Sequence, residues 1–248
     1  MRRFAEALAT LERAERWLLP GACLLCQEVA SATDADPLVC DLCLGRLRRL
    51  SHPQCSRCGE PHGGLTEPCR VCADWPTAFG PVRSAVWLDD QARSVIHHLK
   101  YGGWRRVADS LGRLMLPVLE APMDAVLAPI PLSSRRLRRR GYNQAEALAQ
   151  ALGRLSGRLV RTDLLRRTRE TPTQTTLAPE ARQANVHAAF EVPPPVHSLL
   201  RKSGFPVILI DDVFTTGATL RSAASALLEG GTKRVGAVTF ARALPPLG

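Results

Sequence analysis

Eight cysteines are the residues of this 248-residue chain whose type and spacing point most directly to chemistry. They form four C-x-x-C pairs: Cys23 with Cys26, Cys40 with Cys43, Cys55 with Cys58, and Cys69 with Cys72. Two residues between thiolates let one tight turn aim both sulfurs at one metal ion, and two such turns complete a tetrahedral site. Eight ligands therefore predict two Zn²⁺ ions. Closed four-thiolate sites hold small modules together, so we expect both ions to be structural.

The spacing leaves open which pairs share a zinc ion. Sequential pairing, in which the first pair joins the second and the third joins the fourth, closes the shorter loops and is favoured over interleaved pairing. Charged residues interrupt the first 25 positions, and the chain has no apolar run of membrane-spanning length. We therefore expect a cytoplasmic protein without a membrane span, whose thiols stay reduced and available to metal.

An acidic pair followed by a hydroxyl-rich turn is the second chemical feature. Residues 207–219 read Val-Ile-Leu-Ile-Asp-Asp-Val-Phe-Thr-Thr-Gly-Ala-Thr, which predicts a buried strand, a turn and the start of a helix. Backbone N–H groups at such a helix start bind phosphate. Hydroxyl donors and a close backbone approach come from Thr215, Thr216, Gly217 and Thr219. Asp211 and Asp212 suit ribose hydroxyls or a bound Mg²⁺, so the segment predicts a ribose 5-phosphate site.

A basic segment follows another predicted strand. It carries five arginines in six positions: Arg135, Arg136, Arg138, Arg139 and Arg140. Guanidinium groups at this edge of an α/β sheet can hold a pyrophosphate or a nucleic-acid backbone. The only two tyrosines, Tyr101 and Tyr142, adjoin basic residues, and aromatic rings among cations can bind a single strand by stacking. Packing of both rings under loops is an equally good interpretation.

Strands that alternate with helices must position these groups. The patterns predict strands at 82–88, 124–130, 207–210 and 235–240. They predict helices from Asp89 or Asp90 to Lys100, over 104–120 with an end or bend at Pro117, and over 142–155 and 220–228. Segments 168–179 and 193–204 are rich in proline and predict loops. We expect an N-terminal helix (1–22), a double zinc ribbon (23–75) and an α/β domain with a parallel sheet (76–248).

The charge indicates the class of partner. A formal net charge of +10 and a pI of about 9.8 favour a polyanion, either nucleic acid or a phosphorylated small molecule. Two zinc ions bound by eight thiolates would lower this charge to about +6. The excess is concentrated near 135–140 and 100–106. The glycine-rich patterns of P-loop NTPases and dinucleotide-binding domains are absent, which argues against both classes.

Residues 207–219 resemble the phosphoribosyl-pyrophosphate (PRPP) motif of type I phosphoribosyltransferases, with Phe214 where that superfamily usually has an aliphatic residue. The wider order of motifs resembles the competence protein F (ComF) family over residues 20–242. That order is a double zinc ribbon, Lys-aromatic-x-Gly at 100–103, Pro-x-Pro before Arg-Arg-Gly-aromatic-Asn-Gln, and the PRPP motif. The resemblance implies a type I phosphoribosyltransferase fold, a parallel sheet flanked by helices, preceded by a small Cys-rich module.

The resemblance also implies roles for single residues. Asp211 and Asp212 would face the ribose hydroxyls with Mg²⁺ and are the catalytic candidates. The 5′-phosphate of PRPP would be wrapped by Thr215, Thr216, Gly217, Ala218 and Thr219. A hood-like segment would include Gln174, Arg182, Asn185 and Phe190. Beyond the resemblance, we expect that in a transfer reaction Lys100 and the arginines of 135–140, beginning with Arg135 and Arg136, would neutralise the leaving pyrophosphate.

Three functions stay open, because no residue stands out as the pocket for an acceptor base. The first is a pyrophosphate-releasing phosphoribosyltransferase in nucleoside metabolism. The second is a competence factor that binds single-stranded DNA through Arg138, Arg139, Arg140, Tyr101 and Tyr142. The third is a PRPP-sensing adaptor whose zinc module docks a helicase or another DNA-uptake protein. The ComF family is linked to natural transformation, in which imported single-stranded DNA reaches the cytoplasm.

Overall fold

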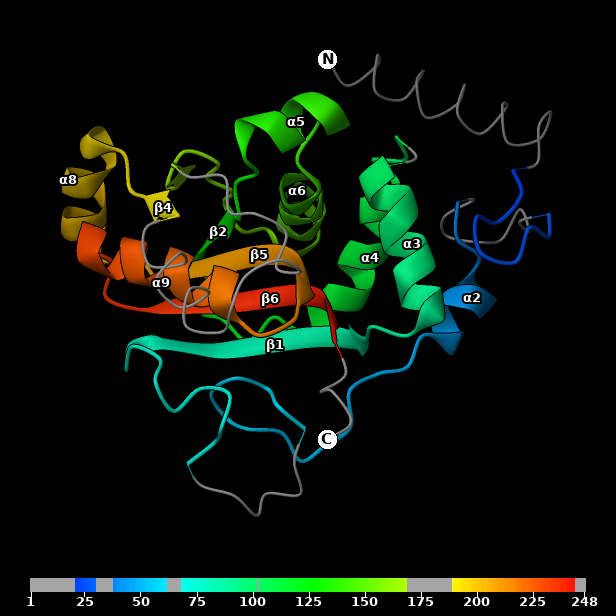
Figure 1. The fold of residues 1–248 in the computed structure, drawn as a ribbon, viewed down its shortest axis with the longest axis horizontal. Coiled ribbons are helices and arrows are strands. Elements are labelled where there is room, and N and C mark those ends of the chain that lie inside the picture. Colours follow the sequence, from blue (N-terminus) through cyan, green and yellow to red (C-terminus); the bar gives the residue numbers. More distant parts are fainter. Residues whose placement is uncertain (1–20, 30–37, 62–67, 102, 169–188, 244–248) are drawn as a thin grey trace.

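A four-stranded parallel sheet forms the centre of the molecule (Figure 1). The computed structural model describes residues 21–29, 38–61, 68–101, 103–168 and 189–243. The strands lie in the order β1 (Phe79–Trp87), β6 (Val235–Arg242), β5 (Val207–Phe214) and β2 (Val126–Pro129). Every residue of β6 is buried, as expected for an inner strand covered by helices on both faces.

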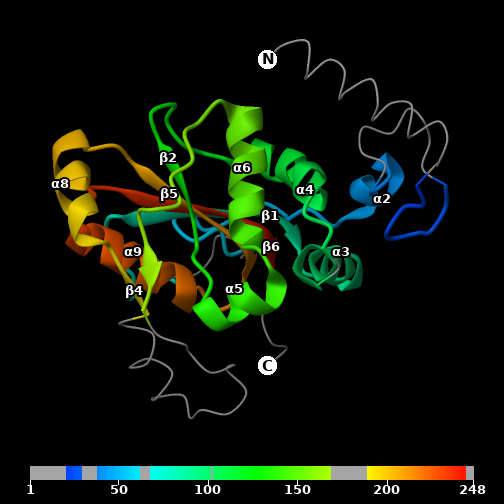
Figure 2. The same cartoon turned by 90° about the horizontal axis from the view of Figure 1, so that it is seen from above.

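Helices cover both faces of this sheet (Figures 1 and 2). One face packs against α3 (Asp90–Tyr101), α4 (Val107–Met115) and α6 (Gln144–Ser156), and the other against α8 (Pro194–Ser203) and α9 (Ala218–Gly230). Alternate residues of β5 serve the two cores, because successive side chains of a strand point to opposite faces. The remaining elements are α2 (Asp41–Arg46), η1 (Leu116–Val118), α5 (Ser134–Arg140), β3 (Arg166–Arg167) and β4 (Phe190–Glu191). Strands β3 and β4 pair antiparallel.

Element ends follow local chemistry at several of the predicted positions. The Asp89 carboxylate accepts the Ala92 N–H at 2.9 Å and so caps α3. Helix α4 stops before Pro117, which lies in the short 3₁₀ turn η1. Strand β5 runs four residues beyond the predicted Ile210, because β6 pairs with it as far as Phe214.

Two segments for which no helix was predicted are helical. The proline-rich segment 193–204 was expected to be irregular, but it forms α8, with Pro193 as N-cap and two prolines in the first turn. Proline fits there because the first N–H groups of a helix have no partner inside the helix. The basic segment, for which no helix was predicted, forms α5, and the Ser133 hydroxyl accepts the Arg136 N–H at its start.

The cysteine-rich part packs directly against the sheet and its helices. Cys23 and Cys43 belong to the core beneath α3, α4 and α6, whereas Cys58 and Cys72 belong to the core on the α9 side. The predicted N-terminal helix and residues 169–179 of the predicted loop lie outside the described residues, except for positions 21 and 22. Among the helices that the structure describes, none has the length and apolarity needed to cross a membrane.

Candidate functional site

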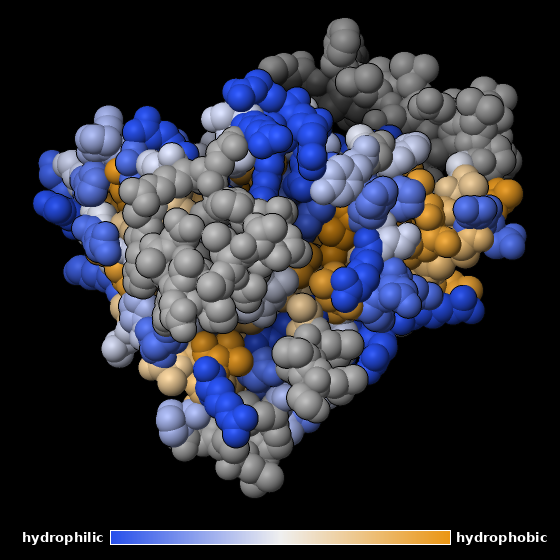
Figure 3. Space-filling view, viewed as in Figure 1, coloured by the Kyte–Doolittle hydropathy of each residue, from blue (hydrophilic) through white to orange (hydrophobic). Residues whose placement is uncertain are grey.

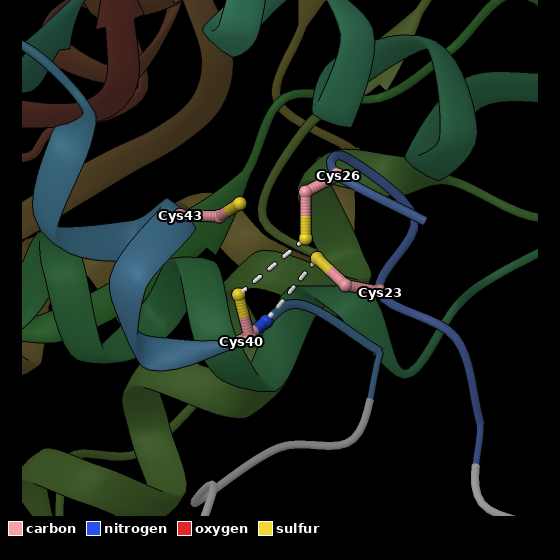
Figure 4. Close-up of side chains that lie close together, drawn as sticks. All are labelled: Cys23, Cys26, Cys40 and Cys43. Carbon is pink, nitrogen blue, oxygen red and sulfur yellow. Dashed lines mark hydrogen bonds between the residues drawn. The ribbon is translucent and has the colours of Figure 1, made fainter. Parts of the chain in front are cut away.

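The cysteine sulfurs gather into two groups of four, and their membership confirms sequential pairing. The first group is Cys23, Cys26, Cys40 and Cys43, and the second is Cys55, Cys58, Cys69 and Cys72. Within each group all sulfurs lie within 4.8 Å of one another. Figure 4 shows the first group, in which the sulfurs of Cys26 and Cys40 are 3.9 Å apart.

These distances fit a zinc ion. A tetrahedron of sulfurs at about 2.3 Å from zinc has edges of about 3.8 Å. In the second cluster the Sγ atoms of Cys55 and Cys72 are 3.8 Å apart, and those of Cys58 and Cys69 are 3.6 Å apart. The four-thiolate donor sets and their spacing therefore suit structural zinc, with no position left for a substrate.

The pKa values of the thiols also indicate that a cation is needed to keep all four ligands of a cluster deprotonated. Burial raises the pKa of Cys23, but backbone N–H groups of Cys26, Cys40 and Leu25 outweigh it and lower this pKa to about 7. In the second cluster, burial raises the pKa of Cys58, and it raises that of Cys72 to about 12. A bound metal ion would supply the positive charge that keeps all four ligands deprotonated.

Strand β5 delivers the acidic pair to two different environments. Asp212 points to the α3 and α6 side and is 4% exposed. Its carboxylate forms an ion pair with Lys100 at the end of α3 and accepts a 3.2 Å hydrogen bond from the Gln144 Nε2 group. Asp211 is half-buried, and its Oδ1 atom accepts the Asp212 N–H at 2.8 Å.

The two carboxyl groups therefore differ in charge preference. Burial raises the pKa of Asp211 well above its usual value, and the neighbouring Asp212 charge raises it further. Burial also acts on Asp212, but Lys100 and Gln144 outweigh it and lower the pKa of that carboxyl. Asp212 thus holds a fixed, compensated negative charge, and Asp211 is the member that readily carries a proton.

The turn after β5 presents a helix N-terminus. Thr215 and Thr216 are exposed, and Gly217 has a φ of 76°, a conformation that favours glycine. A Cβ atom at Gly217 would lie 2.9 Å from both Phe214 Cζ and Trp75 Cζ2. Helix α9 begins at Ala218 after the N-cap Gly217, which has no side chain, and the Thr216 hydroxyl accepts the Ala218 N–H at 3.5 Å. The N–H groups at such a helix start can receive an anion.

Helices α3 and α5 bring the predicted basic and aromatic residues together beside the acidic pair. The Arg140 guanidinium donates to Gln144 Oε1 at 2.6 Å and to the Tyr101 hydroxyl at 3.3 Å. The Cζ atoms of Arg140 and Arg139 lie 5.0 and 5.9 Å from the centre of the Tyr101 ring, which belongs to a residue 53% exposed. A chain of polar contacts therefore runs from Tyr101 through Arg140 and Gln144 to Asp212.

The other arginines of α5 form the outer part of this flank. Arg135 and Arg138 are exposed and Arg136 is half-buried. Figure 3 shows a strongly hydrophilic patch over α5. Because β2 and β5 are parallel neighbours, the segment after β2 lies at the same sheet edge as the acidic pair.

Tyr142 lies apart from this exposed surface. Its hydroxyl donates to the Leu99 carbonyl, its side chain packs against the core, and burial raises its pKa. Within the hood-like segment, Phe190 is buried in β4, whereas Gln174, Arg182 and Asn185 lie outside the described residues.

Sequence reasoning missed two contributors to the site. Gln144 ends the Arg-Arg-Gly-aromatic-Asn-Gln motif without a predicted role. Trp75 lies against the turn after β5 although it is far from it in sequence. Gln144 could have been found from its place one residue after a helix-capping Asn143, whereas no local signal marks Trp75.

Two family models match the chain. Residues 137–244 match the phosphoribosyl transferase domain, a range that begins within α5 and includes the acidic pair and the turn after β5. Residues 14–74 match the double zinc ribbon domain, which contains both cysteine clusters. Together with the parallel sheet and the flanking helices, these matches confirm the predicted fold class.

Curated relatives match over most of the chain. DNA utilization protein YhgH of Salmonella typhi is 32% identical over 225 residues, covering 88% of this chain and 95% of the relative. Competence protein ComFC of Bacillus subtilis (strain 168) is 29% identical over 206 residues, covering 79% and 80%. Competence protein F of Haemophilus influenzae is 28% identical over 213 residues, covering 82% and 90%.

Proposed function

Because this chain belongs to the competence protein F (ComF) family, we propose that it binds PRPP or a related phosphoribosyl ligand with Mg²⁺ and acts in DNA uptake or nucleotide handling. One observation carries the ligand proposal. The acidic pair near the end of β5 is followed by a glycine turn and by the N-terminus of α9. Hydroxyl-binding and phosphate-binding groups thus lie one turn apart, as a sugar phosphate requires.

The proposed ligand would be divided among three groups of residues. N–H groups at the start of α9 and the hydroxyls of Thr215, Thr216 and Thr219 would hold the 5′-phosphate. Asp211 would accept hydrogen bonds from the ribose hydroxyls while Asp212 keeps its charge beside Lys100. Carboxylate oxygens together with ligand phosphates are the donors that Mg²⁺ prefers, so the acidic pair fits this ion. Bound there, Mg²⁺ would neutralise pyrophosphate charge.

The positive side of the site would face the pyrophosphate. Lys100 at the end of α3 pairs with Asp212, and Arg135 and Arg136 lie on α5, which follows the strand beside β5. In a transfer reaction, the bond from the ribose anomeric carbon to the pyrophosphate oxygen breaks, pyrophosphate keeps the electron pair, and an acceptor atom bonds to the carbon. These cations would stabilise the charge that develops on the leaving group. Turnover would be detected as pyrophosphate release with PRPP and a panel of nucleobases.

A thermal shift measurement tests the ligand proposal. PRPP with Mg²⁺ at about 100 times its Kd should stabilise the wild-type chain by about 2.7 kcal/mol. The double variant Asp211→Asn with Asp212→Asn should lose most of that shift. The matched control is Asp109→Asn with Asp163→Asn, which removes two carboxylates paired with Arg154 and Arg161. Equal shifts in wild type and the Asp211 and Asp212 variant would contradict the proposal.

Single-stranded nucleic acid is the second candidate ligand, and the exposed Tyr101 ring beside Arg139 and Arg140 favours it. Stacking on such a ring adds about 1–3 kcal/mol per base. We expect the affinity for an oligothymidylate to fall linearly with salt on logarithmic scales, and to drop in Tyr101→Ala.

Arg139→Ala should lower the salt slope of this binding, by about 0.7 for each phosphate that the arginine neutralises in the wild-type complex. Arg154→Ala removes the same charge from α6 and should leave the slope unchanged. A flat salt response, or equal effects of the two arginine variants, would rule out this surface.

A further inference from the structure

Trp75 connects the second cysteine cluster to the turn after β5. It follows Cys72 by three residues and is 6% exposed. Its ring stacks on Phe79 with centroids 4.7 Å apart and lies 6.3 Å from the centroid of Phe214. A Cβ atom added at Gly217 would lie 2.9 Å from Trp75 Cζ2, so the indole packs directly against the turn after β5.

Arg242 makes a second connection between the second cysteine cluster and Phe214. Its guanidinium lies 4.0 Å from the centre of the Phe214 ring, and the residue is 2% exposed at the end of β6. The same guanidinium donates to the Cys58 carbonyl at 3.0 Å and pairs with Glu60. The last residue of β5 is therefore in contact with a ring that follows one proposed metal ligand, Cys72, and with a cation bound to the carbonyl of another, Cys58.

The segment between the cluster and β1 is itself fixed in place. The Arg57 guanidinium donates to the carbonyls of Cys72 at 3.0 Å, Trp75 at 2.8 Å and Phe79 at 3.1 Å. One residue before Trp75, Asp74 pairs with Arg221 in α9, whose N–H donates to the Gly217 carbonyl at 2.8 Å. Movement of the cluster would therefore displace both the Trp75 ring beside the turn and the first turns of α9.

The first cysteine cluster provides a matched comparison. Its buried members share a core with α3, α4 and α6. Within the described residues, that core contains neither Trp75 nor Phe214 nor Leu220, all of which belong to the other core. The two clusters have the same ligands but different connections.

We propose that Trp75 and Arg242 are positioning residues for the Thr215–Thr219 turn and that the metal-bound second cluster holds both in place. Zinc at a four-cysteine site supplies folding free energy to the loops that carry the ligands. Loss of that metal frees Cys58 and Cys72, and with them the carbonyl bound by Arg242 and the segment that carries Trp75. The turn then loses its contact with the Trp75 ring, whereas loss of metal from the first cluster has no such effect. Only the identity of the ligand in this inference rests on the function proposed above.

Hydrogen exchange in the full chain tests the metal connection without any ligand. The readout is the peptide that spans residues 213–224. Exchange in this peptide should become at least about tenfold faster in Cys69→Ser with Cys72→Ser, because local opening becomes cheaper. The matched variant Cys40→Ser with Cys43→Ser should leave it within about twofold of wild type. Equal acceleration in both variants, or none in the first, would overturn the inference.

Substitution of Trp75 tests the positioning role apart from the metal ligands, and it decides the question where the cysteine variants do not fold. Trp75→Ala should keep two zinc ions per chain yet weaken binding of ribose 5-phosphate by at least about tenfold, and Trp75→Phe should restore most of the affinity. Wild-type exchange in the 213–224 peptide of Trp75→Ala would overturn the inference. Failure of the wild-type chain to bind ribose 5-phosphate or PRPP would instead reject the proposed function, because the exchange result needs no ligand.

Discussion

At the scale of single residues, Gly217 combines a conformational and a steric requirement. Its φ of 76° suits glycine, and its missing side chain leaves room for the Trp75 and Phe214 rings. Gly217→Ala should lower the free energy of unfolding by about 1–3 kcal/mol, because strain and overpacking act together. It should also abolish the thermal shift by PRPP.

Gly141 supplies the control for this substitution. It has a φ of 79°, but a Cβ atom there would have no neighbour within 4 Å. Gly141→Ala should therefore show the conformational cost alone, and denaturant unfolding measures both variants. Equal losses of stability would mean that contact with Trp75 and Phe214 does not matter.

The acidic pair gives a pH-dependent prediction. The folded-state pKa of Asp211 is raised above its unfolded value of about 3.9, so its contribution to stability is complete below that pH and is lost as pH rises through the folded pKa. Asp211→Asn removes the ionisable group, so the variant does not lose stability in this way as pH rises. The stability of the variant relative to wild type should therefore increase from pH 4 upward, as measured by urea unfolding at a series of pH values.

Asp212 should behave in the opposite way, because its folded-state pKa is lowered. Its stabilisation is present above about pH 3.9 and is lost only as pH falls further. Asp212→Asn should therefore reduce stability at neutral pH and leave Lys100 without its partner. A gain of stability in this variant at pH 7 would contradict the assignment of the charge to Asp212.

At the scale of elements, the start of α6 places Gln144 against Asp212. The Asn143 side chain accepts the Ala145 N–H at 3.1 Å, and its Nδ2 group donates to the Ile130 carbonyl at 3.0 Å. Asn143→Ala should lower the free energy of unfolding by about 1–2 kcal/mol, because it removes the helix cap and the hydrogen bond to the Ile130 carbonyl after β2. Asn143→Ser keeps a capping oxygen and should recover part of that loss in urea unfolding. Equal stability of the alanine variant and wild type would contradict the role of this cap.

Most elements could be predicted because their signals are local. Hydrophobic periodicity identified the four strands of the parallel sheet and the helices α3, α4, α6 and α9, with errors mainly at their ends. Helix α8 was missed because the three prolines at 193–195 also fit a loop, and only packing of Val196 and Leu200 into the core decides between a loop and a helix. The extension of β5 past Ile210 depends on pairing with β6, which a polar pair of residues does not reveal.

The residues of the candidate site also divide into those with a local sequence signal and those without one. The cysteine sets and the acidic pair with its turn were predicted, because each lies within a short stretch of sequence. Trp75 and Arg242 reach the turn from distant parts of the chain, so no spacing rule indicates them. The Lys100–Asp212 ion pair likewise needs α3 and β5 to meet in space.

At the scale of the whole molecule, the two cysteine clusters share their cores with opposite faces of the sheet. Removal of zinc by a chelator should therefore lower the melting temperature of the whole chain in a single cooperative transition. Calorimetry with and without chelator measures this. A separate low-temperature transition for the cysteine-rich part, with the sheet domain unchanged, would show that the clusters form an independent module.

Phe214 stands where the PRPP motif usually has an aliphatic residue, and its surroundings explain this difference. The Phe214 ring contacts both the Trp75 indole and the Arg242 guanidinium, whereas a branched aliphatic chain would offer neither of them a π face. These three positions and the second cysteine cluster should then change together in evolution. Homologues that have lost the cluster should carry aliphatic residues at the Phe214 position and lack the Trp75 and Arg242 counterparts, so that the ring becomes a marker of metal dependence readable from sequence alone.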